Sequence, residues 1–156
     1  MRRRQRAPYS NAMSDPTHAL SLKQPWAALL VHGRKSIEVR NWPTPRRGRF
    51  FIHAARLPDL RDEAWKHVTP DLRDTAELTG GIIGIATLLD CKMYASLDEF
   101  NADRSRHLND PEWFVPPRLY GFVFADMEVR PYRRLPGWMR FFPVERGEGN
   151  KNRNRR

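Results

Sequence analysis

The first half of the chain alternates between apolar and polar positions in three places, and a strand is expected at each. The sequence predicts these strands at residues 18–22, 36–42 and 48–55. In the second of them Ile37 and Val39 alternate with polar residues, so they should face the core while their neighbours face the opposite side. The residues on that opposite side are Ser36, Glu38, Arg40 and Trp42.

Apolar residues at helical spacing predict a helix between the first two strands and further helices after the third. Pro25 suits the first turn of a short helix, because its φ is fixed and its missing N–H is not needed there. The apolar stripe of that helix is Trp26, Leu29 and Leu30, and Gly33 should end it. Residues 59–78 are charged with a few apolar residues at helical spacing, which predicts one or two surface helices.

The second half of the chain reads mainly as strands. Residues 82–91 are β-branched and apolar, as in a central strand, and Ser96 with Glu99 three residues later is typical of a capped helical turn. Further strands are expected at 120–125 and 138–144, with residues 129–132 either continuing the first of these or pairing with it. Five or six short strands with a few short flanking helices indicate a small α+β barrel, and the 156-residue length fits one domain.

The net charge of +10 lies mostly at the two ends of the chain. Residues 1–12 contribute +4 and residues 146–156 another +4, which leaves +2 for the rest. We therefore expect a basic, disordered tail at 1–16, a folded domain at 17–145 and a second basic, disordered tail at 146–156. Such tails attract phosphates without regard to sequence, but they can equally be solubilising ends or remnants of cloning.

Charge within the domain is segregated along the chain. Residues 34–56 contain seven basic residues and Glu38 as the only acid, residues 59–112 are rich in acids, and four arginines follow at 130–140. The two basic segments could meet on one face of the fold and bind nucleic acid, or they could belong to a solvated surface of mixed charge.

Several chemistries have no support in the sequence. Cys91 is the only cysteine, and the five histidines lack the spacing of a helical zinc pair. There is no phosphate-binding glycine loop, nucleophile elbow or dinucleotide fingerprint, and no apolar run long enough for a membrane helix. We therefore expect no metal, no cofactor and no membrane partner, and a monomer in the cytoplasm, or in the nucleus of a eukaryote.

One dense constellation lies between residues 19 and 55, with looser agreement at 81–91 and 120–144. It consists of Ser21-Leu22-Lys23-Gln24-Pro25-Trp26-Ala27, Gly33-Arg34-Lys35-Ser36-Ile37-Glu38-Val39-Arg40-Asn41-Trp42, Arg46-Arg47-Gly48-Arg49 and Ile52-His53-Ala54. In order and spacing this run resembles the ASCH (activating signal cointegrator homology) family, a branch of the PUA-like superfamily. The resemblance implies a PUA-like β-barrel with a cleft beside the first helix that binds RNA, or alternatively DNA.

Nucleic-acid chemistry can be assigned to residues of this constellation. A glutamate can accept a hydrogen bond from an exocyclic base amine, an indole can stack on an unpaired base, and arginine can bind phosphate through two hydrogen bonds. We therefore expect recognition of single-stranded or flipped-out bases of RNA, modified bases included, in a basic cleft. The predicted binding residues are Gln24, Trp26, Lys35, Glu38, Arg40, Trp42, Arg47, Arg49 and His53.

Structural interpretations of the same residues stay open. Glu38 and Arg40 could form a surface ion pair, Trp26 could anchor the core, and Trp42 could plug the mouth of the barrel. Gln24 could serve the start of the helix, and His53 could be an interior histidine with satisfied hydrogen bonds.

Two other functional classes compete with binding. The cleft could serve a small hydrolase, either a metal-dependent ribonuclease or an amidohydrolase of modified nucleosides, with Lys35, Glu38 and His53 as the catalytic candidates. The amidohydrolases that resemble this family use a lysine, a threonine and a glutamate; Lys35 matches the lysine, but Glu38 stands where the threonine would be. The third class is a protein-interaction module whose tails alone contact nucleic acid.

Overall fold

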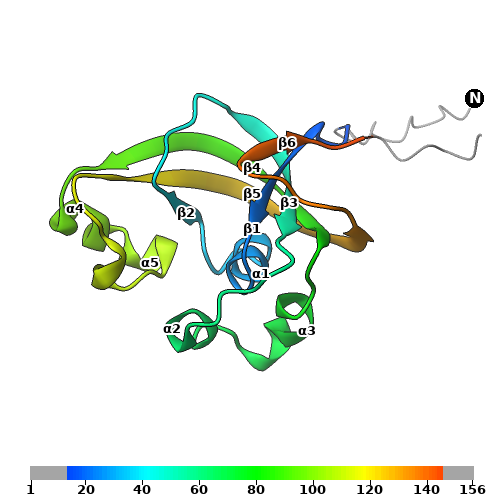
Figure 1. Ribbon diagram of the computed structural model, residues 1–156, viewed down its shortest axis with the longest axis horizontal. Coiled ribbons are helices and arrows are strands. Elements are labelled where there is room, and N and C mark those ends of the chain that lie inside the picture. Colours follow the sequence, from blue (N-terminus) through cyan, green and yellow to red (C-terminus); the bar gives the residue numbers. More distant parts are fainter. Residues whose placement is uncertain (1–13, 146–156) are drawn as a thin grey trace, which may run out of the picture.

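The computed structural model describes residues 14–145, which form one mixed six-stranded sheet with short helices around it (Figure 1). The predicted tails at 1–16 and 146–156 lie outside the described residues except for 14–16. The strands are β1 (His18–Leu22), β2 (Ile37–Arg40), β3 (Gly48–Ala54), β4 (Gly81–Tyr94), β5 (Leu119–Arg134) and β6 (Phe141–Pro143). Their order in the sheet is β2-β5-β4-β3-β1-β6, and β1 and β3 are the parallel pair.

Every helix of the described chain is short. The α-helices are α1 (Trp26–Val31), α2 (Asp62–Trp65), α3 (Arg73–Ala76), α4 (Leu97–Ala102) and α5 (Arg104–His107). Two 3₁₀ turns, η1 (Pro70–Leu72) and η2 (Pro111–Trp113), complete them. None of the helices within residues 14–145 has the length and apolar character needed to cross a membrane.

The predicted closed barrel is wrong: the sheet is open, and its edge strands β2 and β6 are not paired with each other. The local sequence explains why. β2 has four residues and β6 has three, and the chain that continues β2 contains Pro43 and Pro45, which cannot donate backbone hydrogen bonds. The α+β class and the count of six strands are as expected, whereas the ladder that would close a barrel is absent from the described residues.

The two longest strands, β4 and β5, form an antiparallel pair that arches over α1 (Figure 1). Residues 129–132 continue the strand predicted at 120–125, so that both segments belong to β5, and the strand predicted at 82–91 extends to Tyr94. Three register shifts along the pair, and a positive φ of 51° at Asp126, allow strands of this length to bend.

Helix α1 is buried along its whole length against the sheet. Gly84 on β4 makes this approach possible, because a Cβ there would lie 2.5 Å from Cγ1 of Val31. The main cluster around α1 combines Leu30 and Val31 with Leu22, Ile52 and Phe122. This packing fixes α1 against β1, β3 and β5, and Trp42, which follows β2, packs against the same cluster.

Candidate nucleic-acid interface

A cleft of about 850 Å³ opens beside the N-terminal end of α1, between the end of β2 and the loop that joins β5 to β6. We call it the central cleft. Its lining residues are Ser21, Lys23, Trp26, Glu38, Arg40, Asn41, Trp42, His53, Ala55, Arg56, Asp59, Arg61, Trp113, Gly137, Trp138, Met139 and Arg140.

Glu38 is the carboxylate at the wall formed by β2, and only 8% of the residue is exposed. Its Oε1 lies 3.3 Å from Nζ of Lys35 and accepts a hydrogen bond from the backbone N–H of Val39 at 3.2 Å. Its Oε2 is 3.7 Å from Nη2 of Arg40. The first oxygen is thus committed to the protein, while the second, with its more distant partner, can accept a hydrogen bond from a ligand.

Lys35 lies behind Glu38 and is fully buried. Its Nζ donates to the carbonyl oxygen of His107 at 3.1 Å and sits 4.5 Å from the ring centroid of Trp26. Burial lowers the pKa of Lys35, and the neighbouring Glu38 carboxylate opposes that shift. This arrangement suits a lysine that positions Glu38 from within the core.

Asp59 anchors the opposite wall, and it is buried. Its carboxylate accepts from Nε1 of Trp26 at 2.9 Å and, through both oxygens, from the side chain of Arg61. Burial by itself raises the pKa of Asp59, but these hydrogen bonds outweigh it and lower the pKa to about 2. Arg61 in turn stacks on Trp113, with Cζ 3.7 Å from the ring centroid.

His53 forms part of the floor, and both of its ring nitrogens are engaged. Nε2 lies 2.6 Å from the carbonyl oxygen of Leu135, which can only accept, so Nε2 carries the proton. Nδ1 is 3.0 Å from Oγ of Ser21 and accepts from that hydroxyl in the neutral ring. Burial lowers the pKa of His53, and the hydrogen bond to the carbonyl of Leu135 opposes that shift. Gly137 packs directly on this ring, since a Cβ there would lie 2.5 Å from Cε1 of His53.

Trp42 fills the gap between the two edges of the open sheet. Its ring meets Phe122 of β5 and Phe141 of β6 at nearly perpendicular angles, with centroids 5.0 and 5.9 Å apart. The guanidinium of Arg140 lies 4.8 Å from the centroid of Trp42, and that of Arg40 lies 5.9 Å from it. Trp42 therefore packs as a plug of the sheet while its half-exposed side lines the central cleft.

Comparison with known proteins identifies the family of this fold. The family model of the ASCH domain matches residues 20–132. The chain belongs to the ASCH domain family. ASCH domains are PUA-like domains, generally of an RNA-binding type.

Two curated relatives support the assignment of this ASCH domain. The chain is 34% identical over 104 residues to activating signal cointegrator 1 of Homo sapiens and 32% identical over 104 residues to the same protein of Mus musculus. Each alignment covers 62% of this chain but only 18% of the relative. The ASCH domain thus spans about a fifth of the length of the curated relatives it matches.

Solved structures agree on the fold. The ASCH protein of Zymomonas mobilis matches with a TM-score of 0.58 and 17% identity, covering 82% of this chain and 87% of that one. A serine-to-alanine variant of that Zymomonas protein matches with a TM-score of 0.60 and 16% identity, covering 82% and 87%. At this level of identity the likeness concerns the fold.

The ASCH domain brings five of the nine predicted binding residues to the central cleft: Trp26, Glu38, Arg40, Trp42 and His53. Gln24 is buried and does not line the cleft. Its side chain donates to the backbone carbonyls of Thr75 and Leu78, at and just after α3, and accepts from the backbone N–H of Ala28 in α1. It therefore supports the start of α1, and Lys35 likewise lies behind the lining.

Arg47 and Arg49 lie away from the central cleft. Arg47 binds the carbonyl of Thr44 and lies 3.6 Å from Asp90, and Arg49 binds the carbonyl of Ser14 and lies 3.9 Å from Glu128. The basic segment 34–56 therefore does not form one continuous binding face, because the start of β3 carries these two arginines toward the β4–β5 side of the sheet.

Other lining residues were not among the predicted binding residues, although Arg56 and Arg140 belong to the two basic segments that could meet on one face. Lys23, Arg56 and Arg140 are exposed cations of the cleft, and none of them takes part in an ion pair among residues 14–145. Trp138 and Met139 are 72% and 88% exposed at the mouth. Trp138 and Met139 were expected to belong to the strand predicted at 138–144. Their position between Gly137 and Arg140 was the one sequence signal for an exposed loop.

Within the described residues, no group of three or more His, Cys, Asp or Glu side chains is placed to hold a metal ion. The chemistry that this arrangement supports is that of its own side chains: one carboxylate oxygen open to a hydrogen-bond donor, exposed cations around it, and an exposed indole beside it.

Proposed function

We propose that this ASCH domain binds single-stranded RNA and receives one unpaired or flipped-out base in the central cleft. The observation that carries the proposal is that Lys23, Arg56 and Arg140, which form no ion pair within residues 14–145, line the same cleft as the carboxylate of Glu38. Cations without acidic partners attract phosphates, whereas an acid set among them serves to orient a base.

Glu38 and Arg40 supply the contacts to the base edge. Oε2 of Glu38 accepts from an amine or a ring N–H, and the guanidinium 3.7 Å away donates to a neighbouring ring nitrogen or carbonyl oxygen. Both side chains are already held, Glu38 by Lys35 and Arg40 by the carbonyl of Ser21 at 2.8 Å. Binding then requires little further ordering of either side chain.

Trp138 supplies the stacking surface, with Trp42 as the wall behind the base. Trp138 is largely exposed, so its indole can stack on a base without disturbing the core. Base–aromatic stacking contributes about 1–3 kcal/mol to the binding free energy. Trp42 is held by Phe122 and Phe141 and offers one side to the cleft.

A hydrolase on the same cleft has weaker support from the geometry. Both ring nitrogens of His53 are engaged by Ser21 and Leu135, and Nζ of Lys35 is covered by Glu38, Trp26 and the carbonyl of His107. A general base or a nucleophile needs a free lone pair within reach of the substrate. His53 and Lys35 meet that condition only after the site rearranges, so of the three catalytic candidates only Glu38, through Oε2, offers an open lone pair to a ligand.

The test is a titration of the full chain with labelled single-stranded RNA at several salt concentrations. Replacing Lys23, Arg56 and Arg140 together by alanine should weaken binding and reduce the slope of log affinity against log salt by about 2, at ~0.7 for each lost phosphate contact on a single strand. A matched control replaces Lys66, Arg73 and Arg104, three cations outside the cleft, and it should keep most of the affinity.

Equal losses in the two triple variants would contradict the proposal and favour binding by the tails. Residues 14–145 alone should retain measurable affinity if the cleft is the site. Release of acetate from N4-acetylcytidine by the full chain, abolished in Lys35→Ala, would instead support the hydrolase.

A further inference from the structure

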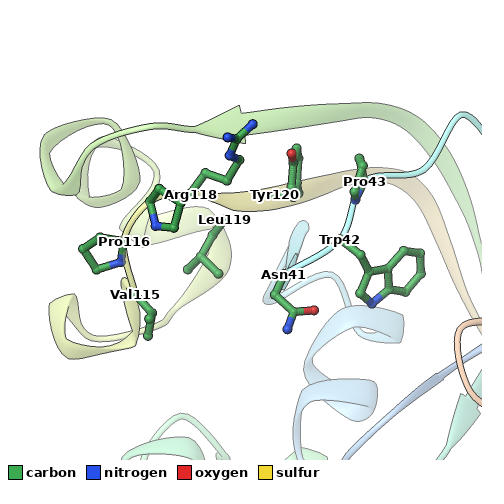
Figure 2. Close-up of a pocket in the computed structure, with 9 residues that line it drawn as sticks. Asn41, Trp42, Pro43, Val115, Pro116, Arg118, Leu119 and Tyr120 are labelled. Atoms are coloured by element: carbon green, nitrogen blue, oxygen red, sulfur yellow. The ribbon is translucent and has the colours of Figure 1, made fainter.

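The central cleft continues into a second hollow between residues 41–43, which follow β2, and residues 115–120, which lead into β5. Figure 2 shows this hollow, with Val115 and Leu119 on one side and Asn41 on the other. Its volume is about 600 Å³, and we call it the Tyr120 groove. Asn41 and Trp42 line both the groove and the cleft, so the two hollows adjoin.

A third hollow of about 770 Å³ lies at the end of β5, and we call it the Tyr132 groove. Its lining residues are Arg56, Thr79, Gly80, Tyr132, Arg134, Leu135, Pro136 and Gly137. Arg56 and Gly137 belong to both this groove and the central cleft, whereas Asn41 and Trp42 join the cleft to the other groove. The central cleft is thus the middle member of three connected hollows.

Each groove repeats the combination found in the cleft, an aromatic ring with an uncommitted cation. Tyr120 and Arg118 line one groove, and Tyr132 and Arg134 line the other. Both arginines are exposed, and neither donates a side-chain hydrogen bond or forms an ion pair within residues 14–145. The hydroxyl of Tyr132 binds the carbonyl of Thr79 at 2.8 Å, which orients the ring while 43% of the residue stays exposed.

We propose that the three hollows form one track for an extended single strand of RNA, with the nucleotides on either side of the central base lying in the Tyr120 groove and the Tyr132 groove. The proposal rests on the proposed function and specifies its ligand as an oligonucleotide in place of a free nucleoside or a single base. A single strand repeats a phosphate and a base at each step, and a track that repeats a cation and an aromatic ring matches that period.

Charge supports this occupant for the grooves. The cations that line the three hollows and lack an ion pair in the described chain are Lys23, Arg56, Arg118, Arg134 and Arg140. The two acids of the track, Glu38 and Asp59, lie in the central cleft and are already bound by Lys35, Arg40 and Arg61. The two grooves are lined by arginines and by no acid among the described residues. They are therefore suited to the phosphates of an RNA strand.

The experiment compares two lengths of ligand on the full chain, using fluorescein-labelled random-sequence oligoribonucleotides of about three and about nine nucleotides, the longer one within the ~4–16 nucleotides that a single-strand-binding domain typically covers. The variants are the double substitution Arg118→Ala with Arg134→Ala and the control Arg73→Ala, an exposed arginine of α3 outside all three hollows. The measured quantity is the ratio of the affinity for the longer ligand to that for the shorter one. The tails are identical in every variant, so any difference between variants comes from the substituted residues.

We expect the double variant to lower this ratio by about tenfold and to reduce the salt slope for the longer ligand by about 1.4, whereas Arg73→Ala keeps both values. An unchanged ratio in the double variant would overturn the track. The Lys23, Arg56 and Arg140 triple variant separates the two proposals. If the triple variant weakens binding of the shorter ligand but the double variant leaves the affinity ratio unchanged, the proposed function is supported and the track is contradicted. If it does not weaken that binding, the proposed function fails.

Discussion

Arg40 on β2 donates a hydrogen bond from Nη2 to the backbone carbonyl oxygen of Ser21 on β1, at 2.8 Å. Three other strands separate β2 from β1 in the order of the sheet, so this side chain spans the opening that a closed barrel would fill with a backbone ladder. Trp42 fills the same opening through its contacts with Phe122 and Phe141. The site therefore lies where side chains, in place of strand pairing, hold the sheet in its curved shape.

Arg40→Met should destabilise the fold as well as weaken binding. The substitution removes the bond to Ser21 and the cation next to Glu38, and hydrogen bonds to charged groups contribute about 1.5–3 kcal/mol to the free energy of unfolding. Urea unfolding measures the loss, with Arg118→Met as the exposed control. If the two variants unfold within ~0.5 kcal/mol of each other, the bridge does not stabilise the sheet.

Trp42→Ala and Trp138→Ala should act on different properties. Trp42 packs between two strands but is only half-buried, so its loss should lower the free energy of unfolding by about 2 to 3 kcal/mol, less than the ~3–5 kcal/mol of a fully buried aromatic ring. Trp138 is 72% exposed, so its loss should leave stability nearly unchanged and reduce RNA affinity by about 1–3 kcal/mol. Thermal melts and RNA titrations of both variants check this pair. A folded Trp138→Ala protein with full affinity would assign the stacking role elsewhere.

Asp59 should stabilise the protein against acid. Its folded pKa of about 2 is below the ordinary value of 3.8, so its stabilisation is present above pH 3.8 and is lost as the pH falls toward 2. At about 1.36 kcal/mol for each pKa unit, the contribution is on the order of 2 kcal/mol. Asp59→Asn should remove most of it at pH 7 and flatten the change in stability between pH 4 and 2. Glu112→Gln, an exposed acid, is the control, and an equally steep acid limb in both variants would contradict the assignment.

Stability should also decline as the pH falls from 7 to 5. Burial lowers the pKa of four histidines, His32, His53, His67 and His107, below the ordinary value of 6.5. A group with a lowered pKa contributes stability that is present above its unfolded pKa and lost as the pH falls through its folded pKa, because the unfolded chain binds the proton more readily.

His53 and His107 should contribute most to this decline, because both are fully enclosed and both use Nε2–H to donate to a backbone carbonyl, of Leu135 and Phe100. Unfolding of His53→Gln and His107→Gln at pH 5 and pH 7 should show a smaller difference than in the parent chain. A difference that neither variant alters would place the titration in other groups.

Local chemistry allowed much of the fold to be read from the sequence. β1 and β3 begin and end within one residue of their expected limits, α1 begins after Pro25, and Ser96 caps α4 by accepting from the N–H of Glu99 at 3.2 Å. Each of these depends on neighbours within four residues, through alternation, a fixed φ or a capping hydrogen bond. The same local run also predicted that Glu38, Arg40 and Trp42 would share one face, and all three line the cleft.

Only the tertiary structure decided which charges meet. Arg47 and Arg49 lie seven and nine residues from Arg40, yet the start of β3 carries them to Asp90 and Glu128, whereas Arg56 and Arg140 come from distant segments to the same cleft. The open sheet was also beyond local reading, because closure depends on whether two edge strands far apart in the chain are long enough to pair. Residue type and spacing determine the elements and their faces, but long-range pairing and packing determine which faces form a site.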